Sequence, residues 1–104
     1  MDRPGRGQRP ALYIAPLHVH HGDDEAWYVL EGRLGFQIGE EEHEIGAGDG
    51  IVAPRGTPHS FWNATAGTTR YLVVMTPKIA QLIEALHGGG DMRELFQRYD
   101  SELL

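Results

Sequence analysis

Short apolar runs separated by turn-forming residues fill most of this 104-residue chain, and they restrict its fold more than any other feature. Between residues 11 and 76 each run is bounded by glycine, proline or aspartate, and none shows a sustained helical period. This spacing is typical of all-β sandwiches and barrels. It predicts strands at 11–20, 26–31, 33–38, 42–45, 50–53, 59–63 and 69–76.

The pattern becomes helical after Met75. Apolar residues then recur at helical spacing, at Ile79, Leu82, Ile83 and Leu86. Thr76 is suited to the N-cap, with proline directly after it, and Asp91 is suited to the N-cap of a second short helix whose apolar face is Met92, Leu95, Phe96 and Tyr99. We therefore predict a flexible arm at 1–10, a β-barrel at 11–76 and a tail of two short α-helices at 77–104, packed on the barrel.

Composition excludes several functions. The formal net charge of −6 disfavours non-specific nucleic-acid binding, which needs lysine and arginine to displace counterions from phosphates. No apolar run approaches the roughly 20 residues of a membrane-spanning helix. The chain has no cysteine, so thiolate chemistry is absent. The arginine-containing N-terminal segment lacks the apolar stretch of a secretory signal, so we expect a cytoplasmic protein with no nucleic-acid or membrane partner.

Four of the residues that can bind metals are spaced for one shared site. His18 and His20 are two apart in a predicted strand, so their side chains share a face. Glu25 follows a turn-prone segment that would return it beside them, and His59 comes from a distant strand. Three imidazoles and one carboxylate suit one divalent transition metal (Fe, Mn, Ni, Co, Cu or Zn) better than Mg or Ca, which prefer oxygen ligands.

These residues stand in two longer patterns that resemble the motifs of the cupin family. The first pattern contains His18, His20, Glu25 and Gly32, and it has Leu12 where the family has a glycine. The second contains Gly48, Pro54, Gly56, His59 and Asn63 and fits at every position. The chain therefore resembles a small single-domain cupin. The resemblance implies a jelly-roll β-barrel with a metal inside its mouth, bound by His18, His20, Glu25 and His59.

The remaining polar residues are given simpler roles. We expect His21 to be a loop residue at the mouth, and His43 and His87 to be surface residues. Asp23 and Asp24 are expected in a solvated turn. Asn63 is expected to hydrogen-bond a loop or the pocket and not the metal.

Apolar residues on the strands have two possible roles. They could line a substrate pocket or fill the barrel core, as any barrel requires; these are Trp27, Val29, Phe36, Ile38, Phe61, Val73 and Met75. The polar tips of Tyr28 and Trp62 could face a ligand or reach water. In the tail, Leu82 and Phe96 are expected to be core residues.

The segment before His18 is shorter than the pair of strands that usually comes first in the family. We therefore expect a barrel with one open edge. An uncovered edge favours pairing with another chain, so we expect a homodimer.

The implied activity is that of a metal-dependent dioxygenase of the quercetinase type, acting on a small molecule with Glu25 as catalytic base. Two alternatives stay open. One is a redox-silent isomerase or polyketide cyclase, in which the ion polarises a carbonyl. The other is a non-catalytic cupin that binds or senses a small molecule.

Overall fold

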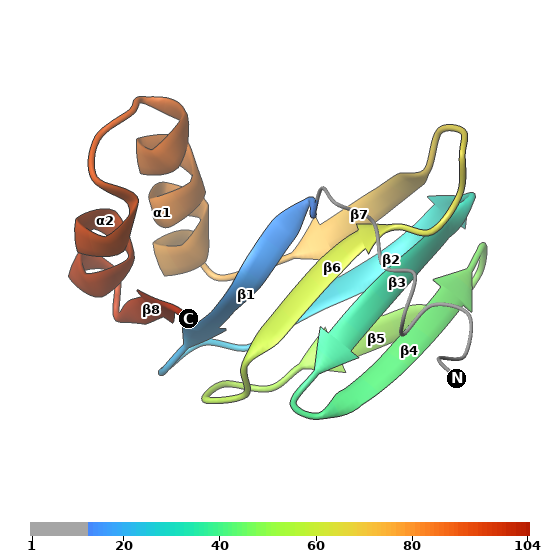
Figure 1. Ribbon diagram of the computed structural model, residues 1–104, viewed down its shortest axis with the longest axis horizontal. Helices are drawn as coiled ribbons and strands as arrows, with labels where there is room; N and C mark the ends of the chain where they lie inside the picture. Colours follow the sequence, from blue (N-terminus) through green and yellow to red (C-terminus); the bar gives the residue numbers. More distant parts are fainter. Residues whose placement is uncertain (1–12) are drawn as a thin grey trace, which may run out of the picture.

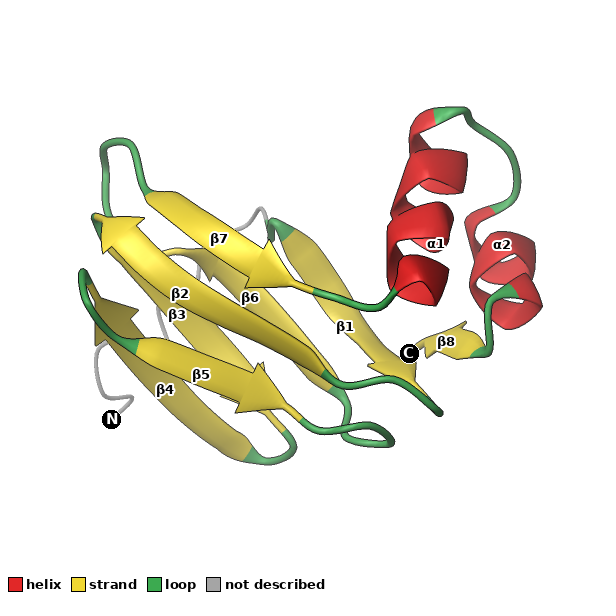
Figure 2. Ribbon diagram, turned by 180° about the vertical axis from the view of Figure 1, so that it is seen from behind, coloured by secondary structure: helices red, strands yellow, loops and turns green. Residues whose placement is uncertain are grey.

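The computed structural model describes residues 13–104, which form two antiparallel sheets followed by two helices (Figure 1). The larger sheet has the order β4-β3-β6-β1-β8; its strands are β1 (Ala15–His20), β3 (Arg33–Ile38), β4 (Glu41–Gly46), β6 (His59–Asn63) and β8 (Ser101–Leu103). The smaller sheet has the order β5-β2-β7; its strands are β2 (Glu25–Glu31), β5 (Gly50–Ala53) and β7 (Arg70–Val74). Figure 2 shows the two sheets lying face to face.

The strand predictions are largely confirmed. Strands β1 to β7 lie at the seven predicted positions, and β3, β5 and β6 have the predicted bounds. The predicted arm at 1–10 lies outside the described residues. So do the first two residues of the predicted strand 11–20, one of which is Leu12. The expected all-β jelly-roll architecture with two C-terminal helices is confirmed.

Inward-facing aromatic and aliphatic side chains join the two sheets. Trp27 and Val29 point inward from β2, and Leu34 and Phe36 point inward from β3; all four are at most 2% exposed. Phe61 on β6 stacks on Phe36 with ring centroids 5.4 Å apart. This packing fixes the strand whose first residue is His59.

Tight turns connect the strands. Gly32, Gly48 and Gly56 have φ angles of 86°, 89° and 77°, in the left-handed region that residues with a Cβ rarely adopt. Asn63 organises the loop between β6 and β7: it donates to the Gly67 carbonyl at 2.8 Å and its Oδ1 accepts from the Thr65 N–H at 2.9 Å. The expected loop role of Asn63 is confirmed.

The two helices begin where the sequence predicts. Helix α1 (Pro77–His87) is capped by Thr76, and α2 (Met92–Arg98) is capped by Asp91. In each case the side-chain oxygen accepts a hydrogen bond of 3.2 Å from the N–H three residues later. Neither helix has the length and apolar character needed to cross a membrane.

The tail also contains a strand that we did not predict. After α2 the chain turns at Asp100, which has a φ of 58°, and enters β8. Strand β8 pairs antiparallel with β1, placing Ser101 opposite His20 and Leu103 opposite His18. The Leu104 N–H adds a hydrogen bond of 3.0 Å to the Leu17 carbonyl.

The C-terminal strand covers part of the edge that we expected to be open. Strand β8 pairs with His18–His20 of β1, on the side that β6 leaves free, and is itself the edge strand of the larger sheet. Among the described residues, β5 and β7 are the edge strands of the smaller sheet.

Candidate metal centre

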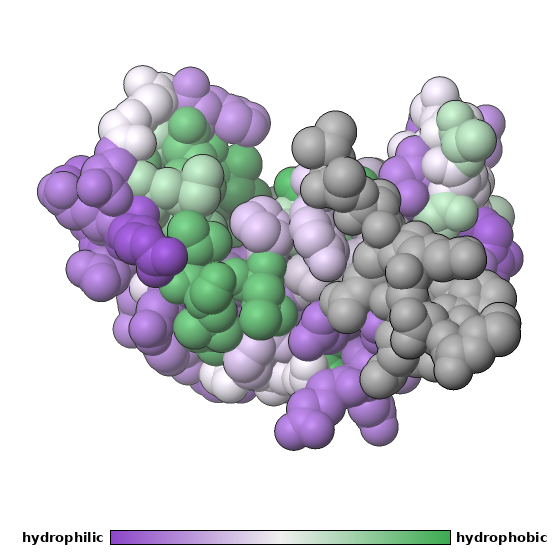
Figure 3. Space-filling view, in the orientation of Figure 1, coloured by the Kyte–Doolittle hydropathy of each residue, from purple (hydrophilic) through white to green (hydrophobic). Residues whose placement is uncertain are grey.

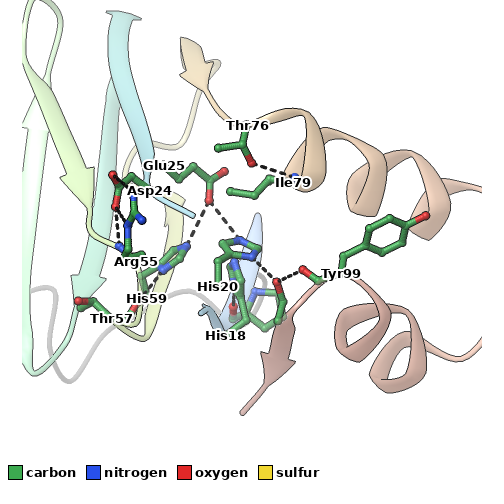
Figure 4. A network of polar contacts seen from close by, with 12 residues as sticks. His18, His20, Asp24, Glu25, Arg55, Thr57, His59, Thr76, Ile79 and Tyr99 are labelled. Atoms are coloured by element: carbon green, nitrogen blue, oxygen red, sulfur yellow. Dashed lines mark hydrogen bonds and ion pairs between the residues drawn. The ribbon is translucent and has the colours of Figure 1, made fainter. Parts of the chain in front are cut away.

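The structure brings His18, His20, Glu25 and His59 together at one end of the barrel (Figure 4). One nitrogen or oxygen from each residue lies within 4.8 Å of those of the others. The two histidines of β1 share a face, Glu25 opens β2, and His59 opens β6 directly opposite His18. All four are buried. The convergence that the spacing predicts is present, and the group could hold a metal ion.

Each imidazole is oriented by a hydrogen bond at Nδ1. His18 Nδ1 lies 2.6 Å from the Pro16 carbonyl, and His59 Nδ1 lies 3.0 Å from the Thr57 carbonyl. His20 Nδ1 lies 2.6 Å from Ser101 Oγ. Since a carbonyl can only accept, His18 and His59 carry a proton on Nδ1. Ser101 Oγ donates to the Tyr99 carbonyl at 3.1 Å, so it accepts from His20 in the same way.

These bonds leave the Nε2 atoms as the free nitrogens of the group. His20 Nε2 lies 3.4 Å from Glu25 Oε1, and His59 Nε2 lies 3.3 Å from the same oxygen. Lone pairs on two nitrogens and a carboxylate oxygen repel one another unless protons or a cation lie between them. The donor set fits a divalent transition metal, and the bonds at Nδ1 are the outer-shell contacts that orient metal-binding histidines.

Burial and neighbouring charges shift two pKa values in the group. Burial, aided by the nearby His59, lowers the pKa of His18 from 6.5 to about 4, which keeps its imidazole neutral at neutral pH. For Glu25, burial acts to raise the pKa, but hydrogen bonds from His20 and His59 outweigh it and lower the pKa to about 2; in the metal-free group these bonds require a proton on each Nε2, which a bound ion would displace. A neutral imidazole and an ionised carboxylate are the protonation states that bind metal ions.

An ion pair outside the group joins the segments that precede Glu25 and His59. The Arg55 N–H donates to Asp24 Oδ1 at 2.8 Å, and the guanidinium donates to both carboxylate oxygens of Asp24 at 3.3 Å. These contacts lower the pKa of Asp24. They join the start of β2 to the turn that precedes His59. The expected solvated turn is confirmed for Asp24, which is exposed.

The same expectation is wrong for Asp23, whose side chain is buried. Helix α1 returns over this turn and places Lys78 Nζ 3.4 Å from Asp23 Oδ2, an oxygen that accepts no hydrogen bond within the described part of the chain. Lys78 Nζ also lies 3.6 Å from Asp100 Oδ2. One lysine thus ties the turn before Glu25 to the tail, and its positive charge compensates the buried carboxylate.

A cavity of about 420 Å³ lies against the group, between the barrel and the two helices. His18, His20 and Glu25 are in its wall. The predicted pocket residues divide between cavity and core: Trp27, Phe61, Val73 and Met75 line the cavity, whereas Val29, Phe36 and Ile38 pack in the core. Leu82 and Phe96, expected to be core residues, are buried and also line the cavity.

The other singled-out residues lie away from the four-residue group. His21 is in an exposed loop near Glu102, and His43 and His87 are exposed, as expected; His87 also reaches the rim of the cavity. Tyr28 is exposed on the outer face of the smaller sheet, and Trp62 is buried; neither lines the cavity.

Ser101 is the site residue that the sequence did not reveal. Its hydroxyl meets His20 only because β8 pairs with β1, 81 positions apart in the chain. A lone serine after a short helix carries no motif, so only a prediction of this strand pairing would have found it.

The comparisons with known proteins agree with this architecture. The family model "Cupin domain" matches residues 9–75. Quercetin 2,3-dioxygenase of Bacillus subtilis is 32% identical over 79 residues, which cover 76% of this chain and 23% of that protein. The HTH-type transcriptional regulator PuuR of Escherichia coli is 34% identical over 59 residues, which cover 57% of this chain and 32% of that protein.

Solved structures share the fold. The crystal structure of TT1209 from Thermus thermophilus superposes with a TM-score of 0.56 and 40% identity, over 60% of this chain and 59% of that one. The chain thus spans under two thirds of the length of each of these relatives. Since the cupin model matches well over half of the residues and the sheets and buried group have the corresponding arrangement, this chain belongs to the cupin family.

Proposed function

We propose that this cupin is a metal-dependent dioxygenase of the quercetinase type, with His18, His20, Glu25 and His59 as the metal ligands. The observation that carries the proposal is the buried, pre-oriented set of three imidazoles and one carboxylate in the wall of a mostly apolar cavity. The 32% identity with a quercetin dioxygenase supports the same reaction class.

When bound, a redox-active ion would bring O2 and an electron-rich substrate together at this group. A dioxygenase places both oxygen atoms of O2 in its product, and the substrate supplies the electrons, so the reaction needs no separate reductant. The work of the chain's own residues is to fix the imidazoles, to bury the reacting atoms and to accept the substrate proton.

We assign the role of proton acceptor to Glu25, whose carboxylate lies in the cavity wall. Its low pKa keeps it ionised and free to accept a proton at neutral pH, although a carboxylate of this acidity is a weak base. Glu25→Gln should remove this role and, through the lost charge, also weaken metal binding. Activity per bound metal ion separates the two effects. If this activity is the same in Glu25→Gln as in the original chain, Glu25 is not the proton acceptor.

The test of the proposal is oxygen uptake by protein loaded in turn with Fe(II), Mn(II), Ni(II), Co(II) and Cu(II), with flavonols, diketones and acireductones as substrates. The Zn(II)-loaded protein is the redox-silent control. Uptake that depends on metal and substrate supports a dioxygenase. No uptake, with turnover of a substrate by the Zn(II) protein, would instead identify the redox-silent isomerase or cyclase.

A binding or sensing role is the second candidate. It is favoured by the 34% identity with the regulator PuuR, over about a third of that regulator. A cupin of this kind would bind its ligand and metal without oxygen uptake and would release the ligand chemically unchanged. Mass analysis of the recovered ligand separates this role from catalysis.

We also propose that the chain forms a homodimer through the outer face of the smaller sheet. Tyr28, Leu30, Val52, Leu72 and Val74 are all exposed there, at 42–65%, and strand pairing places Val52 and Val74 on either side of Ala26. Together they expose on the order of 400 Å² of apolar surface, as large as the largest patch on a typical monomer. Contact between two such patches would supply about half of the roughly 800 Å² per partner of a standard interface, and the polar residues around them would have to supply the rest.

Light scattering tests the assembly. The double variant Leu72→Glu, Val74→Glu should be a monomer at concentrations where the original chain is a dimer. A chain that is monomeric before substitution contradicts the proposal.

A further inference from the structure

We infer that the cavity beside the candidate metal centre takes an uncharged, planar, largely apolar molecule with hydroxyl or carbonyl oxygens at one end, and that the C-terminal helices select it. This inference rests on the proposed function for the statement that the oxygens face the metal. It goes further by naming the class of ligand and the segment that recognises it.

The helices build one whole wall of the cavity. From α1 and α2, the lining residues are Ile79, Leu82, Ile83, Leu86, His87, Met92 and Phe96. The match to the cupin model ends at residue 75, before α1 begins. This wall is therefore a feature that the shared cupin pattern does not supply. Figure 3 shows hydrophobic residues gathered on the helical part of the molecule, on the left, along the side that faces the barrel.

The charge of the lining excludes strongly anionic ligands. No lysine or arginine is among the described residues that line the cavity, and Glu25 is its one carboxylate. A divalent ion beside one carboxylate leaves a net charge of +1. That charge balances one ionised oxygen, such as a hydroxyl that loses its proton on binding. The two or more charges of a dicarboxylate or a phosphate monoester would stay buried without compensation, which is costly.

The shape and chemistry of the walls favour a flat ring system. Trp27 and Phe61 on the barrel side and Phe96 on the helical side present aromatic surfaces. A volume of about 420 Å³ lies in the lower part of the range of roughly 300–1,000 Å³ found for ligand pockets. Outside the metal centre, the polar side-chain groups of the described lining are those of Tyr71 and His87 and the indole N–H of Trp27, which is buried and has no hydrogen-bond partner in the described part of the chain. An apolar body with polar atoms confined to one end matches this distribution.

Equilibrium binding to the Zn(II)-loaded protein tests the inference without any turnover. The uncharged probe is 3-hydroxyflavone, which has adjacent hydroxyl and carbonyl oxygens; the anionic probes are oxalate and glucose 6-phosphate. Binding is followed by quenching of tryptophan fluorescence, since Trp27 lines the cavity, and by calorimetry. We expect saturable binding of 3-hydroxyflavone and no saturable binding of either anion at concentrations about 100-fold higher.

A matched pair of variants tests the helical wall. Ile83→Arg places a cation in the wall and should weaken binding of 3-hydroxyflavone at least about tenfold, a difference of roughly 1.4 kcal/mol. Gln81→Arg adds the same charge on the exposed side of α1 and should leave binding unchanged. Should Ile83→Arg fail to fold, Met92→Arg tests the same wall, because Met92 is already 48% exposed.

Three results would overturn the inference: tighter binding of an anion than of 3-hydroxyflavone, no binding of 3-hydroxyflavone, or equal binding by Ile83→Arg and Gln81→Arg. Failure of the proposed function is seen separately. If 3-hydroxyflavone binds but no redox-metal form takes up oxygen, the proposed dioxygenase activity is refuted and the inferred ligand class is kept. If oxygen is taken up with an anionic substrate, the dioxygenase activity is kept and the inferred ligand class is refuted.

Discussion

Replacing Ser101 by alanine tests whether the C-terminal strand takes part in the metal centre. The hydroxyl accepts a hydrogen bond from His20 Nδ1 at 2.6 Å, and both residues are 3% exposed. Alanine is smaller than serine and leaves the β8 backbone pairing in place, so the variant removes little besides this bond.

The magnitude follows from the burial of the pair. A buried N–H that loses its partner costs about 1–3 kcal/mol. In the metal-free variant, His20 can avoid part of this cost by turning or by moving its proton to Nε2. In the metal-bound variant it cannot, because Nε2 is needed for the ion. Most of the cost should therefore appear as weaker binding, by roughly 10–100-fold, the range found when outer-shell partners are removed.

The assay is a competition for Zn(II) between the protein and a chromophoric chelator of known affinity. Ser101→Thr keeps a hydroxyl and should recover most of the affinity. Glu102→Ala is the matched control, because Glu102 is the next residue of β8 and its side chain is exposed. If Ser101→Ala binds Zn(II) as tightly as the original chain, the hydroxyl does not orient a metal ligand and the reasoning is wrong.

The remaining predictions concern the four-residue group itself. His59→Ala should lose most of the bound metal while circular dichroism still shows a folded barrel, and His43→Ala, an exposed control, should keep its metal content; equal metal in both would refute the assignment. In the metal-free protein the folded state holds the pKa of His18 near 4, below its ordinary 6.5, so the unfolded chain binds more protons between these values. The free energy of unfolding should therefore fall as pH drops from about 6.5 to about 4, by at most about 3 kcal/mol. The low pKa of Glu25 should extend the fall between pH 4.5 and about 2; urea titrations of chelator-treated protein that show constant stability would contradict both shifts.

The sequence was sufficient for features that depend on local geometry. Strand alternation placed His18 and His20 on one face, and the left-handed φ of Gly56 agrees with the turn expected before His59. The caps at Thr76 and Asp91 could be predicted because a hydroxyl or carboxylate oxygen accepts hydrogen bonds from the free N–H groups at the start of a helix. Each of these signals is carried by residues close together in the chain.

Features that depend on contacts between distant segments were missed. The strand β8 spans Ser101–Leu103 and is too short to show an alternating pattern; its pairing with β1 defines it. Asp23 was predicted to be a solvated turn residue because its partner, Lys78, is far away in the sequence and no local pattern indicates their contact. The sequence also could not show which inward-facing residues line the cavity and which pack in the core. Val29 and Trp27 both point inward, but only Trp27 lines the cavity between the barrel and the helices.

The bond between β8 and His20, a proposed metal ligand, has a consequence for amide hydrogen exchange. Coupling between two sites is reciprocal, so an ion that is held more firmly when β8 is docked must also hold β8 more firmly. Loading the protein with Zn(II) should therefore slow amide hydrogen exchange at His21 and Leu104, whose N–H groups bond across the junction of tail and barrel. By the same coupling, separation of β8 from β1 would lower the affinity of the site for the ion.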